Sequence, residues 1–216
     1  ALTAAGGDPN TVTDLTVTGN LKASDIAFMN TMPLLAVLDL ENTQLTLNLF
    51  PDYAFKNNTH IKSIKLPSGI VEIGYEAFFN CTGLTCNLTI PNNVSVIAAS
   101  AFQNCSGLTG NLVIPTSVAT LRSYAFAGCK GFTGNLVIPN SVTWLGNNAF
   151  SACSGFNGVL VIPNSITKIQ SSTFEGCSGL IGNLIIPSSV TTIESFAFIN
   201  CSKLTGSLII PNTVKS

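Results

Sequence analysis

Cysteine is the residue type most able to do chemistry in this chain of 216 residues, which contains seven of them. Six recur at every twenty-fourth position, as Cys81, Cys105, Cys129, Cys153, Cys177 and Cys201. A metal ion needs ligands that converge on one point, and the chain has no Cys-x-x-Cys pair. A disulfide needs Cβ atoms roughly 3.5–4.5 Å apart, whereas stacked strands lie ~4.8 Å apart. We therefore favour a structural ladder of buried, reduced thiols over a disulfide array, with Cys86 in a separate position and the first to react.

Other catalytic groupings are missing from the sequence. His60 is the only histidine, and no Ser or Cys motif surrounds it. No acidic residue occurs between Ala77 and Phe174, and the few glutamates outside that stretch are expected to be solvated surface residues. The glycines follow the structural period and form no phosphate-binding loop. We expect no catalytic residue, no metal site and no cofactor, and hence no enzyme.

Charge restricts the partners further. Charged residues make up 9% of the chain, and the formal net charge is −1. Nucleic-acid binding depends on clustered Lys and Arg, but the nine present here are scattered. No run of 18 apolar residues occurs, so direct insertion into a membrane is not expected.

Proline and phenylalanine follow the same period as cysteine. Prolines recur at every twenty-fourth position from Pro67 to Pro211, and phenylalanines do so from Phe78 to Phe198. Each unit reads approximately Leu-x-Ile-Pro-x-Ser-Val-x-x-Ile-x-x-x-Ala-Phe-x-x-Cys-x-Gly-Leu-x-Gly-x. Units this short cannot bury their own apolar side, so neighbouring units must stack and share one core.

Each unit predicts one coil of a stack. Leu112 and Ile114 should point inward and Val113 outward, because side chains alternate along a strand. Pro115 has no N–H group and ends the strand, after which a second extended segment and a helical turn over 125–129 complete the coil. Nine strand cores, from 15–17 to 208–210, should form one parallel sheet with right-handed coils. Inserted glycines at 110, 134, 158, 182 and 206 indicate a bulge before the strand, and the phenylalanines should stack as an apolar spine.

The block Leu136-Val137-Ile138-Pro139-Asn140-Ser141-Val142, followed by Leu145 and Ala149-Phe150-Ser151-Ala152-Cys153, resembles the BspA-like branch of the leucine-rich repeat superfamily. The resemblance implies a β-rich right-handed leucine-rich-repeat solenoid. It divides the chain into an amino-terminal capping segment with atypical repeats (1–50) and BspA-like repeats with a period of 23–24 (51–216), truncated at the carboxy-terminal end. It also implies the surface location and adhesive roles of such bacterial proteins, and it carries over no catalytic residue.

Two outer surfaces are candidates for ligand contact. The outward strand positions of the carboxy-terminal half are aliphatic: Val113, Val137, Val161, Ile185 and Ile209. These residues either form a contact patch or simply reflect the strand preference of Val and Ile. The second surface is aromatic, with Tyr124, Trp144 and Phe196 at positions that other repeats fill with Lys, Ser, Glu or Asn.

The functional hypothesis from the sequence is a non-enzymatic extracellular protein-binding or adhesion module that uses the outer face of the sheet. Its partner would be a host or surface-matrix protein. The alternatives are a glycan-binding module that stacks sugars on Trp144 and Tyr124, and a structural spacer. The open carboxy-terminal end beside Ile209 further suggests self-association.

Overall fold

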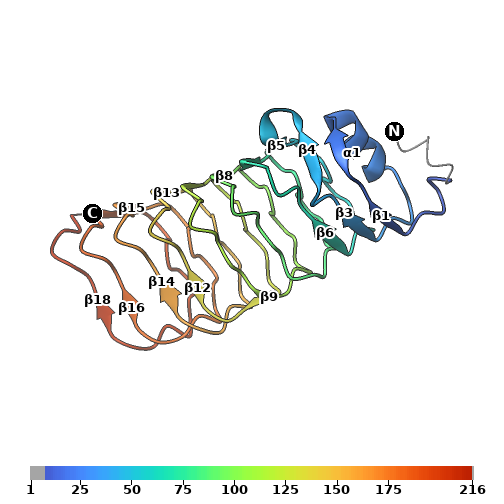
Figure 1. Cartoon of the computed structure of the whole chain (residues 1–216). Coiled ribbons are helices and arrows are strands. Elements are labelled where there is room, and N and C mark those ends of the chain that lie inside the picture. Colours follow the sequence, from blue (N-terminus) through green and yellow to red (C-terminus); the bar gives the residue numbers. More distant parts are fainter. Residues whose placement is uncertain (1–7, 216) are drawn as a thin grey trace.

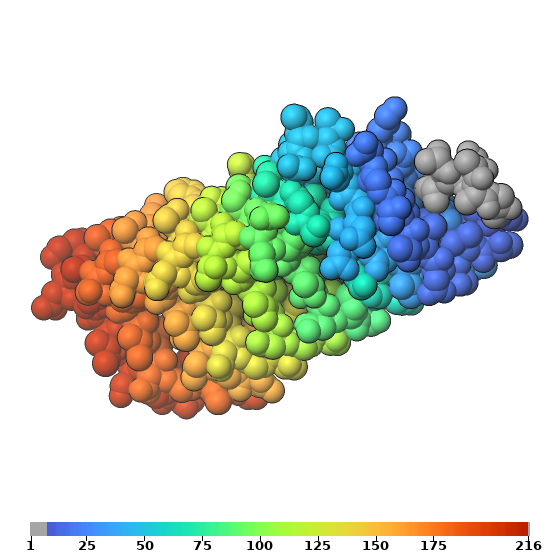
Figure 2. Space-filling model, in the orientation of Figure 1, coloured from blue at the N-terminus to red at the C-terminus, as the bar shows by residue number. Residues whose placement is uncertain are grey.

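The computed structural model describes residues 8–215 and shows an elongated stack of coils whose two ends lie far apart (Figure 1). Every strand pair among these residues is parallel and joins one coil to the next. The predicted parallel β-solenoid is therefore confirmed. Residues 1–7, the start of the expected amino-terminal segment, lie outside the described part. Figure 2 shows neighbouring coils in continuous contact along the molecule.

One row of strands carries the Leu-x-Ile cores. It comprises β1 (Asp14–Thr16), β3 (Val37–Asp39), β6 (Ser63–Lys65), β12 (Leu136–Val137), β14 (Leu160–Val161), β16 (Leu184–Ile185) and β18 (Leu208–Ile209). Two further strands, β9 (Gly110–Asn111) and β11 (Phe132–Thr133), lie just before the cores of their coils. The row is not the single unbroken sheet expected, because the hydrogen-bonded ladder is divided into the groups β1-β3-β6, β9-β11, β12-β14 and β16-β18. Residues 88–90 and 112–114 form no regular strand.

The break in this row has a local cause at the glycine insertion. Gly110 pairs with Phe132, two positions short of the residue that the repeat period would place beside it. Gly110 adopts φ +79° and Gly134 φ +75°, in the left-handed region that glycine favours. The irregularity expected from the inserted glycines is therefore present at Gly110, where the register shifts and the ladder is interrupted, whereas Gly158 and Gly206 do not adopt the left-handed conformation.

A second row runs along another side of the coils (Figure 1). Its five-stranded ladder contains β5 (Leu49–Phe50), β7 (Glu72–Ile73), β8 (Val96–Ile97), β10 (Thr120–Leu121) and β13 (Trp144–Leu145), followed by the pair β15 (Lys168–Ile169) and β17 (Thr192–Ile193). Near the amino terminus lie β2 (Gly19–Leu21), α1 (Ala23–Asn30), β4 (Thr43–Leu45) and a 3-10 turn (Thr46–Asn48). The sequence did not predict α1, which buries Ile26 and Met29 against the first coils.

The phenylalanine spine is confirmed. Phe78, Phe102, Phe126, Phe150, Phe174 and Phe198 stack in order. Successive ring centroids lie between 5.1 Å (Phe78 to Phe102) and 6.0 Å (Phe150 to Phe174), with planes within 12° of parallel. The spine joins all these coils into one hydrophobic core.

A glycine lies two positions after five of the six ladder cysteines and packs closely against the preceding coil; Lys203 holds this position in the last coil. At Gly131 a Cβ would lie 2.3 Å from the carbonyl oxygen of Leu108 in the preceding coil. Gly83, Gly107, Gly155 and Gly179 occupy the same position and leave no more than 2.5 Å to backbone atoms. In these five coils the Cys-x-Gly signature therefore marks a position where the backbone of the preceding coil leaves no room for a side chain.

The helical turn expected at 125–129 is wrong in detail. Two hydrogen-bonded turns form instead, because Ala127 N donates to Tyr124 O and Cys129 N donates to Phe126 O. Tyr124 (φ +61°) and Gly128 (φ +75°) are both left-handed, which stops a helix from continuing. The last coil also differs from the others, since Leu208 and Ile210 are more than half exposed. Across residues 8–215 no helix is long and apolar enough to cross a membrane.

Candidate functional site

The aliphatic stripe consists of Val113, Val137, Val161, Ile185 and Ile209, at the outward positions of the first row. Their side chains are between 41% and 60% exposed. Parallel pairing places Val137 beside Val161 and Ile185 beside Ile209 in register. With ~4.8 Å between strands, the five positions span about 19 Å along the molecule. Val159, at 41% exposure, adds a further aliphatic side chain to the border of the stripe.

The asparagines beside this stripe serve the fold. Asn135 Oδ1 accepts a hydrogen bond from Val159 N at 2.9 Å, and Asn183 Oδ1 accepts one from Ser207 N at 3.0 Å. Each amide therefore satisfies a backbone donor of the next coil. The aliphatic stripe itself makes no such contribution, since its side chains face solvent.

The three aromatic candidates do not form one cluster. Tyr124 and Phe196 occupy the same left-handed corner position, both at φ +61°, in coils three periods apart. That separation corresponds to about 14 Å. Trp144 lies on β13 in the second row and is 55% exposed, while Tyr124 and Phe196 are 42% and 63% exposed. Other coils place Ser100, Asn148 and Ser172 at this corner.

An aromatic and charged cluster near the amino-terminal coils was not anticipated from the sequence. The rings of Tyr53 and Tyr75 meet edge to face at 5.3 Å, and Lys56 Nζ lies 5.1 Å from the Tyr53 centroid. Lys56 also pairs with Glu76 at 2.5 Å. Hydrogen bonds from Lys56 and from the Tyr75 hydroxyl lower the pKa of Glu76. Tyr53 and Glu76 occupy the same left-handed corner as Tyr124 in a later coil. They are 23 positions apart instead of 24, so the repeat period did not reveal that they are equivalent.

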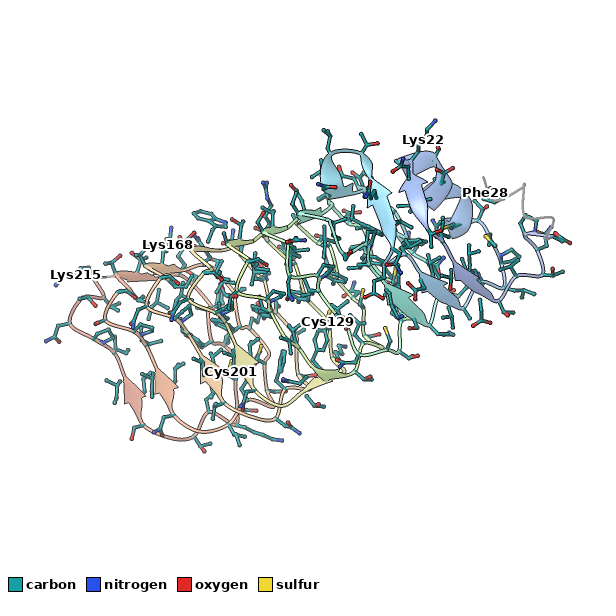
Figure 3. The ribbon with its side chains drawn as sticks, viewed as in Figure 1. Lys22, Phe28, Cys129, Lys168, Cys201 and Lys215 are labelled. Carbon is teal, nitrogen blue, oxygen red and sulfur yellow. The ribbon has the colours of Figure 1, made fainter. Side chains whose placement is uncertain are left out.

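The six ladder cysteines share one contact. Each thiol donates to a phenylalanine carbonyl of the preceding coil, from Cys81 to Phe55 O at 2.8 Å through Cys201 to Phe174 O at 3.1 Å. Figure 3 shows Cys129 and Cys201 aligned along the molecule. All seven cysteines are free, and five of the ladder thiols are buried, whereas Cys201 and Cys86 are partly exposed.

Burial controls the ionisation of these thiols. It raises the pKa of Cys153 to about 12 and that of Cys201 to about 11. It also raises the pKa values of Cys105, Cys129 and Cys177 well above the usual thiol value. A protonated, buried thiol is a poor nucleophile and a poor metal ligand, so the arrangement favours structure over chemistry.

Asparagine replaces cysteine in the coil that precedes the cysteine ladder. Asn58 is buried, and its Nδ2 donates to Asn30 Oδ1 at 2.8 Å. Its Oδ1 accepts hydrogen bonds from the backbone N–H groups of His60 and Ile61, each at 2.9 Å. An amide can join α1 to the loop in this way, whereas a thiol offers one weak donor.

No catalytic or metal-binding arrangement stands out in the described part of the chain. Between residues 8 and 215, no group of three or more His, Cys, Asp or Glu side chains could hold a metal ion. His60 is exposed, and its backbone N–H is bonded to Asn58.

The chain is similar to solved bacterial leucine-rich repeat structures. One is a leucine-rich repeat protein from Bacteroides ovatus, with 29% identity and a TM-score of 0.70 over 77% of this chain and 42% of that chain. Another is the T. pallidum leucine-rich repeat protein, with 25% identity and a TM-score of 0.64 over 89% of this chain and 79% of that one. A leucine-rich cell surface protein from Faecalibacterium prausnitzii shares the fold, with 22% identity and a TM-score of 0.53 over 92% and 64% of the two chains.

This chain therefore spans less than half of the Bacteroides protein. A comparison with curated proteins found no match. The model of the BspA type leucine-rich repeat region matches six copies, over residues 22–157 and 108–216. Regions of this kind are generally non-enzymatic scaffolds that bind proteins. The stacked coils, the phenylalanine spine and the family match agree, and the chain belongs to the BspA-type leucine-rich repeat family.

Proposed function

We propose that this chain is a non-enzymatic protein-binding module of the bacterial cell surface that uses the aliphatic stripe as its contact face. The observation that carries the proposal is the alignment of five outward Val and Ile side chains on consecutive coils, each at least 41% exposed. Exposed aliphatic side chains in such numbers are uncommon on a surface that has no partner. The name of the Faecalibacterium protein supports the surface location.

The charge pattern suits an apolar contact. No acidic residue lies between Ala77 and Phe174, and the outward side chains of the stripe carry no charge. Binding should therefore depend on burial of aliphatic area and respond weakly to salt. The partner would be an extracellular host or matrix protein with an apolar patch of its own.

The test is saturable binding of the purified chain to a panel of purified extracellular-matrix proteins, with Val161→Lys as the variant. We expect the affinity for a bound partner to fall about tenfold or more, because the lysine would enter the middle of a desolvated contact. Val71→Lys is the matched control, since Val71 is 37% exposed and lies outside the stripe. No saturable binding to any panel member, or equal binding by the Val161→Lys variant, would refute the proposal.

We also propose that this 216-residue chain self-associates through its last coil. Leu208 and Ile210, at positions that earlier coils bury, are 58% and 52% exposed, and Ile209 continues the stripe beside them. Sedimentation at increasing concentration should show larger species for the wild type and fewer for a chain with Ile185→Lys and Ile209→Lys. A wild-type chain that stays monomeric at all concentrations would contradict this.

A further inference from the structure

We propose that a groove on the second row of strands, between Arg122 and Trp144, binds a carboxylated sugar of an acidic glycan. The site is separate from the aliphatic stripe, which lies on the first row. The groove is open, measures about 480 Å³, and is lined by Ala99, Thr120, Arg122, Ser123 and Trp144. Its volume falls in the range of roughly 300–1,000 Å³ that is typical of small-ligand sites.

Small residues occupy the position of Arg122 in the two adjacent coils. Along the second row, the position of Arg122 is occupied by Ala98 in the preceding coil and by Gly146 in the following coil. Gly146 N donates to Leu121 O, and a Cβ on Gly146 would lie 2.4 Å from Ser123 N, so no side chain fits there. Neither adjacent coil therefore places a long side chain at the position of Arg122, and the groove beside Arg122 is lined by Ala99, Thr120, Ser123 and Trp144.

Trp144 forms one wall of this space. It pairs in register with Thr120 across the β10–β13 ladder, which makes Arg122 its diagonal neighbour. Arg122 is the only arginine of the chain and Trp144 the only tryptophan. The repeat requires neither residue. In other coils the position of Arg122 holds Gly74 or Glu194, and the position of Trp144 holds Glu72 or Lys168. Both side chains are exposed, so their packing adds little to the fold.

The charge of Arg122 is not neutralised within residues 8–215, where it takes part in none of the ion pairs. The segment 77–174 contains three cations, Arg122, Lys130 and Lys168, and no acid. Lys168, labelled in Figure 3, occupies the position of Trp144 in the next coil and is already paired with Glu194 at 2.6 Å. An incoming carboxylate would therefore meet an unpaired guanidinium whose fork geometry suits bidentate binding.

A sugar fits this combination better than a peptide does. The apolar face of a pyranose ring can stack on Trp144, its hydroxyls can bond Thr120 and Ser123, and its carboxylate can bind Arg122. A peptide gains most of its affinity at a sheet by adding a strand to a free edge. The strand beneath the groove, β10, is already paired on both sides with β8 and β13. A ligand in this groove can therefore contact side chains but cannot pair with the backbone of β10.

The test uses an array of uronate-containing and sialylated oligosaccharides, each printed beside its neutral counterpart, such as trigalacturonate beside its methyl ester and sialyllactose beside lactose. We expect at least one acidic probe to bind while its neutral counterpart does not. Affinity for that probe should fall about tenfold or more in both Arg122→Gln and Trp144→Ala, and by less in Arg122→Lys, which keeps the charge but loses the fork. Binding should weaken as salt is added.

Two matched controls separate this site from the rest of the surface. Lys130→Gln removes an exposed cation of the same coil, and Phe196→Ala removes an exposed aromatic ring three coils from Tyr124; both should bind like the wild type. Variants of the aliphatic stripe should also leave this binding unchanged. The proposal is overturned if no acidic probe exceeds its neutral counterpart, or if Arg122→Gln binds as well as the wild type. Arg122-dependent binding of a hexaglutamate peptide in place of the glycans would likewise overturn it.

Discussion

The buried thiols should make the stability of this protein fall steeply at alkaline pH. Cys105, Cys129, Cys153 and Cys177 are buried, and burial raises their pKa values, that of Cys153 to about 12. In the unfolded chain a thiol has a pKa of about 8.5–9. Above that pH the unfolded state therefore binds fewer protons than the native state. The free energy of unfolding must then decrease as pH rises, from about 9 up to the native pKa.

The magnitude follows from proton linkage. Each thiol that stays protonated in the native state but is ionised in the unfolded state lowers the free energy of unfolding by ~1.4 kcal/mol per pH unit. The four buried thiols together give a slope of about 5–6 kcal/mol per pH unit near pH 10. Such a slope can exhaust the roughly 5–15 kcal/mol stability of an ordinary domain within one to three pH units. Below about pH 9 the thiols are protonated in both states, so this loss of stability does not occur there.

The assay is urea unfolding followed by circular dichroism at several pH values from 7 to 10.5, with reductant present. Cys129→Ser keeps a donor for Phe102 O but does not titrate, so its slope should be smaller than that of the wild type by ~1.4 kcal/mol per pH unit. Cys86→Ser, at a partly exposed position outside the ladder, is the control and should keep the wild-type slope. Identical slopes for the Cys129→Ser variant and the wild type would show that burial does not hold the proton, and would refute the reasoning.

Four further substitutions test the packing and charge described above. Phe126→Ala should cost about 3–5 kcal/mol in urea unfolding and Phe198→Ala clearly less, because Phe126 is fully buried and Phe198 only partly; equal losses would contradict this difference in burial. Gly131→Ala should destabilise by several kcal/mol, since its Cβ would meet the preceding coil at 2.3 Å; a wild-type urea midpoint would show that the coils can separate. Glu76, whose pKa is lowered by Lys56 and Tyr75, stabilises the native state above about pH 4.5 and loses this effect as pH falls. Glu76→Gln should therefore show a smaller decline of the urea midpoint between pH 5 and pH 3, and an unchanged decline would refute the ion pair.

The sequence was sufficient to predict the features that repeat. Stacked coils impose the same contacts on every unit, so the side chains that fill the core recur at one period, as Phe126 and Cys129 do. The same logic predicted the outward exposure of the stripe. The broken ladder could not be predicted, because the register shift at Gly110 depends on how a bulge meets the neighbouring coil. The left-handed corner could not be predicted because different residue types occupy it in different coils; Tyr124 in one coil corresponds to Asn148 in the next.

The features that do not repeat left no periodic signal. Helix α1 replaces part of a coil near the amino terminus, so no later unit resembles it. The cluster around Tyr53 and Tyr75 was hidden by a change of one position in the spacing. The groove beside Arg122 is lined by residues of more than one coil, including Trp144 of the coil that follows. Only the stacking of coils brings such residues together.

A solenoid of this kind separates the residues that hold it together from those that can recognise a ligand. Its core positions are filled alike in every coil, so they cannot distinguish one part of the surface from another. Any specificity must come from outward positions where one coil departs from its neighbours. Arg122, Tyr124 and Trp144 are such departures, and they fall in two adjacent coils, where the exposed corner of Tyr124 even adopts a conformation that costs an aromatic residue about 1–2 kcal/mol. Because neither the core nor the ladder needs these three residues, substitutions there should change ligand binding without changing the stability of the stack, and a loss of stability in Arg122→Gln or Trp144→Ala would contradict this separation.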